Sequence, residues 1–255
     1  MAKLYGLLGQ KLGHSFSKNY FTEKFHHAKT DAVYENFEIA EIEEFETVIR
    51  ENPNLAGLNV TIPYKEAIIP YLDGLTLTAE LVGAVNVIEF RNGRHFGHNT
   101  DVVGFRESLS EVYEPGPGGV ALILGTGGAS KAVKYALSHY FAFDEIIYVS
   151  RNPSGENVIG YDDLDAALMK KTLLVVNTTP LGMFPDVDSM PDIPVALLQK
   201  ECLVFDLTYN PTETKLLQAA KAHGCMIKNG MAMLVKQADA GWSIWNGKPA
   251  DPDKR

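Results

Sequence analysis

Cysteine and long apolar stretches are scarce in this chain. Its two cysteines, Cys202 and Cys225, fall in expected strands of one sheet. We interpret them as a reduced, structural pair, and the sequence is also compatible with a disulfide between them. No segment approaches the ~18 consecutive apolar residues of a membrane span. The run from Met1 to Tyr5 leads into an expected strand and does not resemble a signal peptide. These absences predict a cytoplasmic protein with no membrane partner.

An excess of basic residues is missing as well. The 255 residues contain 23 lysines and arginines against 32 aspartates and glutamates, a formal net charge of −9. Because phosphate backbones demand a basic surface, we expect no nucleic-acid partner. The chain also lacks low-complexity tracts and internal repeats. Its length and its 45% hydrophobic content suit one large globular domain or two small ones.

Strands alternate with helices along the whole chain. In the first half, the expected strands are 4–9, 33–39, 56–62, 86–90 and 95–98. The expected helices there are 15–27, 40–51, 64–72 and, after a break at Gly74, a further short one. Asn92-Gly93 between the last two strands is typical of a hairpin turn. This alternation predicts a mainly parallel α/β sheet.

The Pro/Gly cluster at 114–119 is long enough to mark a domain boundary. The apolar run 120–124 after it predicts a strand that is buried on both faces. Further expected strands are 145–149, 172–176, 203–207 and 226–228. Expected helices of this half are 101–113, 131–140, 161–169, 214–223 and 231–245. The second half is therefore also predicted to be α/β.

The segment "NVTIPYKE", residues 59–66, gathers polar groups at the end of an expected strand. Pro63 ends that strand because it offers no N–H to the ladder and fixes its own φ. Asn59 and Thr61 project from one face, and Lys65 falls in the first turn of the helix expected over 64–72. A helix N-terminus carries partial positive charge, so the ammonium form of Lys65 is mildly disfavoured, which suits proton exchange. The set predicts a site for a polyhydroxylated anion; the alternative is an ordinary solvated lysine.

Serines and an aspartate also stand where helices are expected to begin. Thr100 or Asp101 can cap the helix over 101–113, and capping alone accounts for either residue. Ser15 can likewise cap the helix over 15–27. One cap does not account for Ser15 and Ser17 together, which leaves a binding role open for them.

A glycine-rich turn, "GTGGAS" at 125–130, follows the buried strand and precedes a helix. In this context glycines let a dinucleotide pyrophosphate approach the backbone and the N–H groups of the helix. The next strand ends in "SRN" at 150–152, where an NAD site places an acidic residue. Arg151 can pair with the 2′-phosphate of NADP and stack on its adenine. These features predict NADP as the cofactor.

Seven motifs occur in the order found in one protein family. They are "NVTIPYKE", "GAVNV", "NTDVVGF", "LGTGGAS", "NTTPLGM", "DLTYNPTET" and "NGMAMLVKQA", and they cover nearly the whole chain. As a set they resemble the shikimate dehydrogenase family. The resemblance implies an N-terminal α/β substrate domain over 1–100 and a Rossmann-like NADP-binding domain over 101–232. It also implies that a final helix, with the tail over 233–255, packs back on the first domain.

The resemblance further implies the activity, a reversible reduction of 3-dehydroshikimate to shikimate by NADPH in aromatic amino acid (chorismate) biosynthesis. Lys65 would give the nascent alkoxide a proton, and Asp101 would orient Lys65 and hold a ring hydroxyl. The substrate-binding residues that it implies are Ser15, Ser17, Asn59, Thr61, Asn86, Tyr209 and Gln237. The cofactor-binding residues that it implies are Gly125, Thr126, Gly127, Gly128, Ala129, Ser130, Ser150, Arg151, Asn152, Thr178, Leu207 and Gly230. No metal is implied, and we expect a monomer or a homodimer.

The sequence departs from the family pattern in three places. Lys18 stands where proline is usual, Ser150 and Asn152 flank Arg151 in place of asparagine and threonine, and Leu77 replaces a commonly acidic residue. Two other functions stay open. One is a quinate/shikimate dehydrogenase that accepts NAD, against which Arg151 argues. The other is a catalytically silent paralogue that senses a metabolite, against which the retained lysine, aspartate and glycine turn argue.

Overall fold

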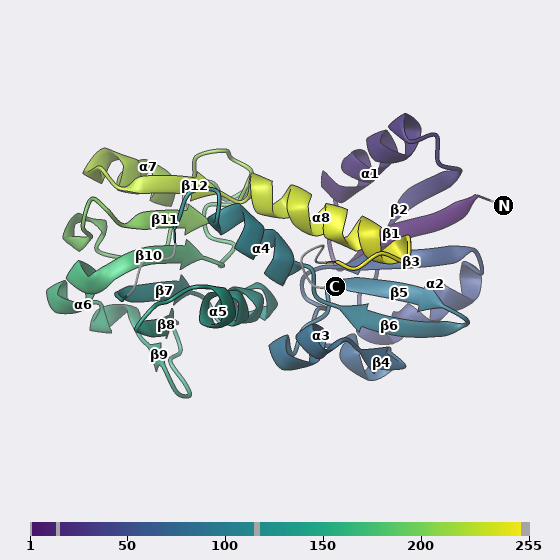
Figure 1. Cartoon of the computed structure of the whole chain (residues 1–255), viewed down its shortest axis with the longest axis horizontal. Coiled ribbons are helices and arrows are strands. Elements are labelled where there is room, and N and C mark those ends of the chain that lie inside the picture. Colours follow the sequence, from purple (N-terminus) through teal and green to yellow (C-terminus); the bar gives the residue numbers. More distant parts are fainter. Residues whose placement is uncertain (1, 14–15, 115–117, 251–255) are drawn as a thin grey trace. The chain divides into compact units, whose positions relative to one another are not determined.

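The computed structural model describes residues 2–13, 16–114 and 118–250 (Figure 1). The chain forms two compact units: unit 1 combines residues 1–100 with 238–255, and unit 2 comprises residues 101–237. Each unit contains one six-stranded sheet with helices, which confirms the predicted α/β class. The contacts place the return to unit 1 at Ala238, whereas the sequence-based division placed it at residue 233. Within the described ranges, no helix is both long and apolar enough to cross a membrane.

The sheet of unit 1 is mixed, with the strand order β2-β1-β3-β5-β6-β4. Its strands are β1 (Lys3–Gly9), β2 (Ala32–Glu38), β3 (Leu55–Val60), β4 (Gly74–Leu75), β5 (Val87–Arg91) and β6 (Arg94–His98). The strands β1, β2 and β3 are parallel, whereas β5 is antiparallel to both β3 and β6. Because of these two reversals, β6 ends at the same edge of the sheet as β1 and β3.

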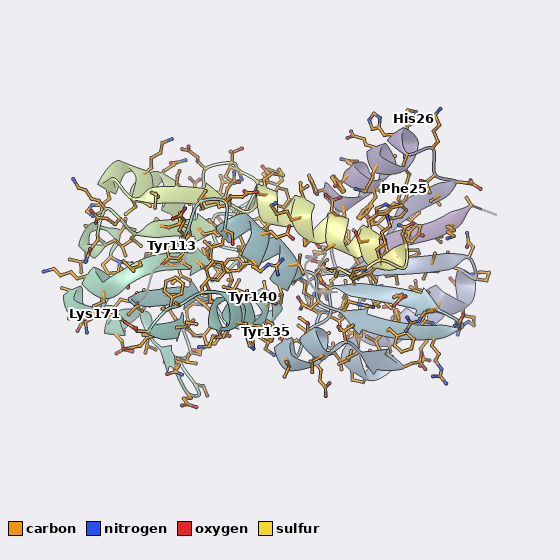
Figure 2. All side chains as sticks on the ribbon, viewed as in Figure 1. Phe25, His26, Tyr113, Tyr135, Tyr140 and Lys171 are labelled. Atoms are coloured by element: carbon orange, nitrogen blue, oxygen red, sulfur yellow. The ribbon has the colours of Figure 1, made fainter. Side chains whose placement is uncertain are left out.

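Helices pack on both faces of this sheet. They are α1 (Phe16–His27), η1 (Ile42–Glu44), α2 (Phe45–Glu51), η2 (Ile69–Tyr71), α3 (Leu77–Val82) and the end of α8 (Met231–Trp245). Alternate residues of β1 enter different hydrophobic clusters, Leu8 on one face and Tyr5 on the other, as a pleated strand requires. Phe25 of α1 joins the Tyr5 cluster, while the neighbouring His26 points outward (Figure 2).

The hairpin of β5 and β6 turns as its sequence predicts. Asn92 and Gly93 have φ angles of 53° and 72°. Positive φ at both central residues is the requirement of a type I′ turn, which glycine and asparagine meet at little cost.

The prediction of a helix over 64–72 is wrong. This stretch forms a series of turns, and only Ile69–Tyr71 is helical, as the short 3₁₀-helix η2. Pro70 explains the difference, because it has no N–H to donate and its ring crowds the carbonyl one turn earlier. Lys65 therefore does not lie in the first turn of an α-helix, and the argument from the helix dipole does not apply to it.

Three smaller differences concern boundaries. Gly74 and Leu75 pair with β6 as the short strand β4 and do not merely interrupt two helices. The helix predicted over 161–169 is divided into η3 (Tyr161–Asp163) and α6 (Ala166–Lys171). A short strand, β9 (Val158–Ile159), pairs with the end of the preceding strand and was not predicted.

The sheet of unit 2 is entirely parallel, with the order β12-β11-β10-β7-β8-β9. Its other strands are β7 (Val120–Leu124), β8 (Glu145–Val149), β10 (Thr172–Asn177), β11 (Leu203–Asp206) and β12 (Met226–Asn229). Its other helices are α4 (Asp101–Leu109), α5 (Gly128–Tyr140), η4 (Val195–Leu197), α7 (Lys215–His223) and the beginning of α8.

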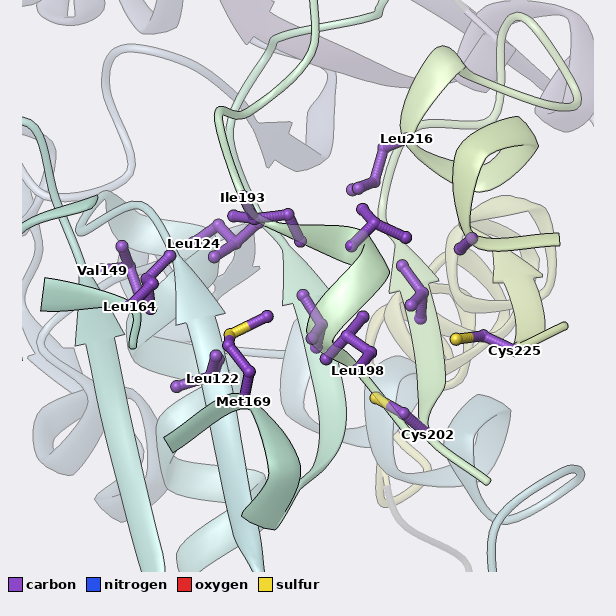
Figure 3. Close-up of a cluster of buried hydrophobic side chains, with 14 of the residues drawn as sticks. Leu122, Leu124, Val149, Leu164, Met169, Ile193, Leu198, Cys202, Leu216 and Cys225 are labelled. Atoms are coloured by element: carbon purple, nitrogen blue, oxygen red, sulfur yellow. The ribbon is translucent and has the colours of Figure 1, made fainter. Parts of the chain in front are cut away.

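The core of unit 2 lies against this sheet (Figure 3). Every residue of β7 is buried, as the continuous apolar run predicted. Cys202 and Cys225 belong to this core and are free thiols. They directly precede β11 and β12, the strands in which they were expected. Burial raises the pKa of both thiols, which keeps them protonated and of low reactivity.

Candidate active site

The polar residues predicted in unit 1 gather at one edge of its sheet. Asn59 lies near the end of β3, Asn86 directly precedes β5, and Thr100 follows β6. Backbone hydrogen bonds join these segments: Val60 N–H donates to Asn86 O at 2.9 Å, and Asn86 N–H donates to His98 O at 3.0 Å. The two strand reversals thus bring together residues that are far apart in the sequence.

Asn86 and Thr100 hold each other by side-chain hydrogen bonds. The Thr100 N–H donates to Asn86 Oδ1 at 2.7 Å, and Asn86 Nδ2 donates to Thr100 Oγ1 at 3.0 Å. Both residues are buried. Because Asp101 comes next and begins α4, this contact fixes the chain directly before the predicted catalytic carboxylate. Asp101 is itself buried, and a carboxylate at a helix N-terminus is favoured.

Lys65 lies in the turns that follow β3, where the backbone is held on both sides. The hydroxyl of the preceding Tyr64 donates to the carbonyl oxygens of Ile39 and Ala40, at 2.8 and 2.7 Å. The carbonyl of Lys65 accepts from the Val85 N–H at 2.7 Å. Its side chain is half-buried. These contacts, and not a helix, determine where the ammonium group can reach.

Tyr34 is a member of this polar edge that sequence reasoning missed. Its hydroxyl donates to Asn59 Oδ1 at 2.7 Å, and its oxygen accepts from the hydroxyl of Ser17, the second residue of α1. An aromatic residue in an expected strand indicates core packing, so the sequence carried no signal for this contact. Ser15, which was predicted beside Ser17, lies outside the described residues. Thr61 follows β3 and donates its N–H to Leu8 O at 2.9 Å.

In unit 2, the predicted cofactor residues follow the carboxyl ends of the parallel strands. The chain continues from β7 to the neighbouring β8 and on to β9, and then crosses to β10 on the other side of β7. Such a reversal of strand order is the point where open α/β sheets bind ligands. The positions that follow strands are Gly125 after β7, Ser150 after β8, Thr178 after β10, Leu207 after β11 and Gly230 after β12.

The glycine turn after β7 fits a phosphate group. Gly125 has φ 102°, and a side chain there would lie 2.9 Å from Thr178 Oγ1. Gly127 directly precedes the 13-residue helix α5 and has no side chain to cap it, so the first N–H groups of that helix are open to an anion. Ser130 Oγ donates to Gly127 O at 2.6 Å and steadies the turn. This turn has the features that a site for a dinucleotide pyrophosphate requires.

The turn after β8 contains one cationic side chain, that of Arg151, and no acidic one. Ser150 Oγ accepts from the Asn152 N–H at 3.2 Å, a tight turn that leaves Arg151 exposed. The guanidinium lies close enough to Tyr161 to oppose the rise in its pKa that burial causes. An exposed arginine at this strand end suits a 2′-phosphate.

Comparison with known proteins agrees with this geometry. A sequence model of the shikimate dehydrogenase substrate binding domain matches residues 7–88. Shikimate dehydrogenase (NADP(+)) of Symbiobacterium thermophilum is 38% identical over 98% of this chain and 91% of its own length. The chain belongs to the shikimate dehydrogenase family. The resemblance given by the seven sequence motifs is thereby confirmed.

Solved structures of the shikimate dehydrogenase family share the fold. A shikimate dehydrogenase crystallised in complex with NADP+ is 32% identical, with a TM-score of 0.87 over 97% of this chain and 91% of that chain. Quinate dehydrogenase from Corynebacterium glutamicum, in complex with NAD, is 29% identical, with a TM-score of 0.84 over 96% and 94%. The architecture is thus common to proteins that differ in substrate and in cofactor.

Two family motifs begin with buried polar residues that sequence reasoning also missed. Asn177 opens "NTTPLGM" and Asp206 opens "DLTYNPTET", at the ends of the neighbouring strands β10 and β11. Asn177 Nδ2 donates to Asp206 Oδ1 at 3.0 Å, and the Thr214 hydroxyl donates to Asp206 Oδ2 at 2.7 Å. The Thr208 N–H donates to Asp206 Oδ1 at 3.0 Å. This network fixes the two loops that carry Thr178, Leu207 and Tyr209. The sequence indicates this network only by placing Asn177 and Asp206 at the ends of expected strands.

We expect Asp206→Asn to change how stability depends on pH. Burial raises the pKa of the Asp206 carboxyl, against the hydrogen bonds from Thr214, Thr208 and Asn177. A raised folded-state pKa means that this carboxyl stabilises the fold most below its ordinary pKa, and less as pH rises through the raised value. The melting temperature of the variant should therefore increase relative to that of the wild type as pH rises from about 4. Thermal unfolding over a pH series measures the two melting temperatures, with Asp186→Asn, at an exposed position, as control. A difference between Asp206→Asn and the wild type that stayed constant with pH would contradict the prediction.

Proposed function

We propose that this protein is an NADP-dependent shikimate dehydrogenase that reduces 3-dehydroshikimate reversibly to shikimate. The observation that carries the proposal is the polar edge of unit 1, where Asn59 and Asn86 lie at adjoining strand ends and Lys65 follows β3 on a pinned backbone. Neutral hydrogen-bonding groups with one ammonium suit a polyhydroxylated carboxylate. Membership of the family supports the same substrate class.

The reaction balances with one hydride and one proton. When bound, NADPH supplies a hydride to the carbon of the ring ketone, and the carbonyl π bond breaks as the new C–H bond forms. Lys65 gives its proton to the oxygen, which becomes the hydroxyl of shikimate, and regains a proton from solvent. Asp101 holds a ring hydroxyl next to the reacting carbon. In the reverse direction Lys65 accepts the hydroxyl proton as the hydride leaves.

The remaining polar side chains bind the substrate. We assign the carboxylate to Ser15 and Ser17, and the other oxygens to Asn59, Thr61, Asn86, Tyr209 and Gln237. Support comes from burial, because Asn59, Asn86 and Gln237 are polar side chains kept in the interior. A cytoplasmic location and a monomeric or homodimeric state are parts of the same proposal.

The cofactor is NADP rather than NAD. Gly125 to Ser130 bind the pyrophosphate, Ser150 to Asn152 the 2′-phosphate, and Thr178, Leu207 and Gly230 complete the site. Arg151 is exposed at the end of β8 and is free of any neighbouring acid in that turn. The family fold also serves a quinate dehydrogenase with NAD, so the choice of cofactor depends on this turn and not on the fold.

We expect Arg151→Ala to weaken NADP selectively. A charge-assisted contact to phosphate contributes about 1.5–3 kcal/mol, so KM for NADP should rise roughly 10- to 100-fold. KM for NAD should stay within about twofold, because NAD has no 2′-phosphate. Arg94→Ala, an exposed arginine of the unit 1 hairpin, is the charge-matched control. Equal use of NAD and NADP by the wild type would contradict this assignment.

The function itself is tested by following reduced nicotinamide absorbance with shikimate and NADP+, and with quinate and NAD+. Turnover of shikimate with NADP+ at the higher kcat/KM is the expected result. Preference for quinate and NAD+ would favour the rival dehydrogenase. Binding of shikimate without turnover would indicate a sensor that has lost its activity.

A further inference from the structure

The Tyr34 hydroxyl is the junction of a buried hydrogen-bond chain in unit 1. On one side it donates to Asn59 Oδ1 at 2.7 Å, and on the other it meets the hydroxyl of Ser17. Asn59 continues the chain by donating from Nδ2 to Asn86 O at 3.4 Å, and Asn86 continues it to Thr100. One side chain of β2 therefore connects the beginning of α1 with the polar edge formed by β3, β5 and β6.

The phenol decides which way the Asn59 amide faces. An asparagine side chain has one oxygen that accepts and one nitrogen that donates. Because Tyr34 donates to Oδ1, the amide nitrogen is held on the side of Asn86 O, and its second N–H is available to a ligand oxygen. Without the phenolic O–H, the opposite orientation of the amide, with Nδ2 toward residue 34, would no longer be disfavoured. The orientation of a predicted substrate donor thus depends on Tyr34.

The ring of Tyr34 is held independently of its hydroxyl. It stacks on Phe21 of α1, with ring centroids 4.7 Å apart and planes 11° apart, and is only 2% exposed. Phenylalanine would satisfy this packing equally well. The hydroxyl is therefore the part of the side chain that serves the polar edge.

We propose that Tyr34 is a positioning residue for the substrate, which orients the Asn59 amide so that its second N–H can donate to a ring hydroxyl. This inference rests on the proposed function. It goes beyond it by assigning to a buried core tyrosine the orientation of a substrate-binding amide.

The orientation of the Asn59 amide by Tyr34 does not depend on pH in the working range. Burial raises the pKa of the Tyr34 phenol well above its ordinary value, and the Ser17 hydrogen bond opposes that rise only in part. The phenol therefore stays a proton donor, and the ratio of wild-type to Tyr34→Phe kcat/KM should be constant between about pH 6 and 9. A ratio that follows a titration in that range would contradict the assigned role.

The first experiment compares Tyr34→Phe with the wild type. Loss of one or two hydrogen bonds should raise KM for shikimate about three- to tenfold, with kcat and KM for NADP within about twofold. Tyr5→Phe is the matched control, because Tyr5 is buried in the same cluster and its ring contacts Phe25 and Trp245. A change in Tyr5→Phe equal to that in Tyr34→Phe would overturn the proposal.

A double-mutant cycle separates positioning from a general structural effect. If Tyr34 acts through Asn59, Tyr34→Phe should add less than twofold to KM once Asn59→Ala is present. Fully additive effects would overturn the proposal, even where both variants melt earlier than the wild type. Active wild-type protein with unchanged KM in Tyr34→Phe would overturn this inference alone. Wild-type protein that neither binds nor oxidises shikimate would overturn the proposed function, and this inference with it.

Discussion

Lys65→Met should lower kcat for shikimate oxidation by about 10²- to 10⁴-fold, the usual contribution of a positioned proton donor. Methionine keeps much of the length and apolar stem of the lysine and removes the ammonium group, with its proton and its positive charge. The backbone at Lys65 should keep its place, because Tyr64 and the Val85 N–H hold it without help from the lysine side chain. Affinity for shikimate should therefore change by no more than a few-fold.

The deciding measurement is kcat for Lys65→Met beside calorimetric binding of shikimate to the same protein. Lys3→Met is a suitable control, because Lys3 is exposed at the beginning of β1, at the opposite edge of the sheet. If Lys65→Met turned over within threefold of the wild type, Lys65 would be an ordinary solvated lysine. If binding were lost together with turnover, its role would be to hold substrate rather than to move a proton.

Trp245→Ala should destabilise unit 1 by about 3–5 kcal/mol, which is typical of removing a buried tryptophan. Trp245 stands at the end of α8, 8% exposed, with ring centroids 4.9 Å from Tyr5 and 5.5 Å from Phe21. Its indole Nε1 donates to Ile88 O at 3.0 Å. Gly57 of β3 makes room for it, since a side chain there would approach Nε1 to 2.3 Å. Alanine would leave both a cavity and an unpaired carbonyl.

Scanning calorimetry measures this effect as a loss of roughly 6–20 °C in the melting temperature of unit 1. The melting temperature of Trp245→Phe should fall between those of the wild type and Trp245→Ala, because phenylalanine restores most of the ring contacts but not the hydrogen bond. Trp242→Ala is the matched control, since Trp242 contacts Tyr5 and Phe25 but is only partly buried. A Trp245→Ala protein that melted within 2 °C of the wild type would show that α8 is not needed to close this core.

Local chemistry allowed much of the fold to be predicted. The Asn92-Gly93 pair, the apolar run of β7 and the glycine turn before α5 each specify their structure within a few neighbouring residues. The family motifs placed the remaining elements in order. Ser17 and Asn59 could be named as binding candidates because they are polar and lie at the ends of expected elements, whereas Asn86 was named through the family resemblance.

Contacts made through tertiary structure could not be predicted. Pro70 prevents the helix that the pattern around Lys65 indicated, and the replacing turns depend on hydrogen bonds to residues far along the chain. Tyr34 and Asp206 have partners on other strands, so their sequence neighbours say nothing of their hydroxyl or carboxylate contacts. A buried polar group is recognised only when its surroundings are known.

The discontinuity of unit 1 has a consequence for biosynthesis. Tyr5 and Phe21 are among the first residues made, whereas Trp245, which packs on both, is among the last. At about 5–20 residues per second, roughly 10–50 s pass before Trp245 is made and can cover this apolar face. Unit 2 has all its residues once Gln237 is added, before unit 1 does. A nascent chain that stalls before Ala238 therefore holds one finished unit and one whose core surface is open to chaperones or to other chains.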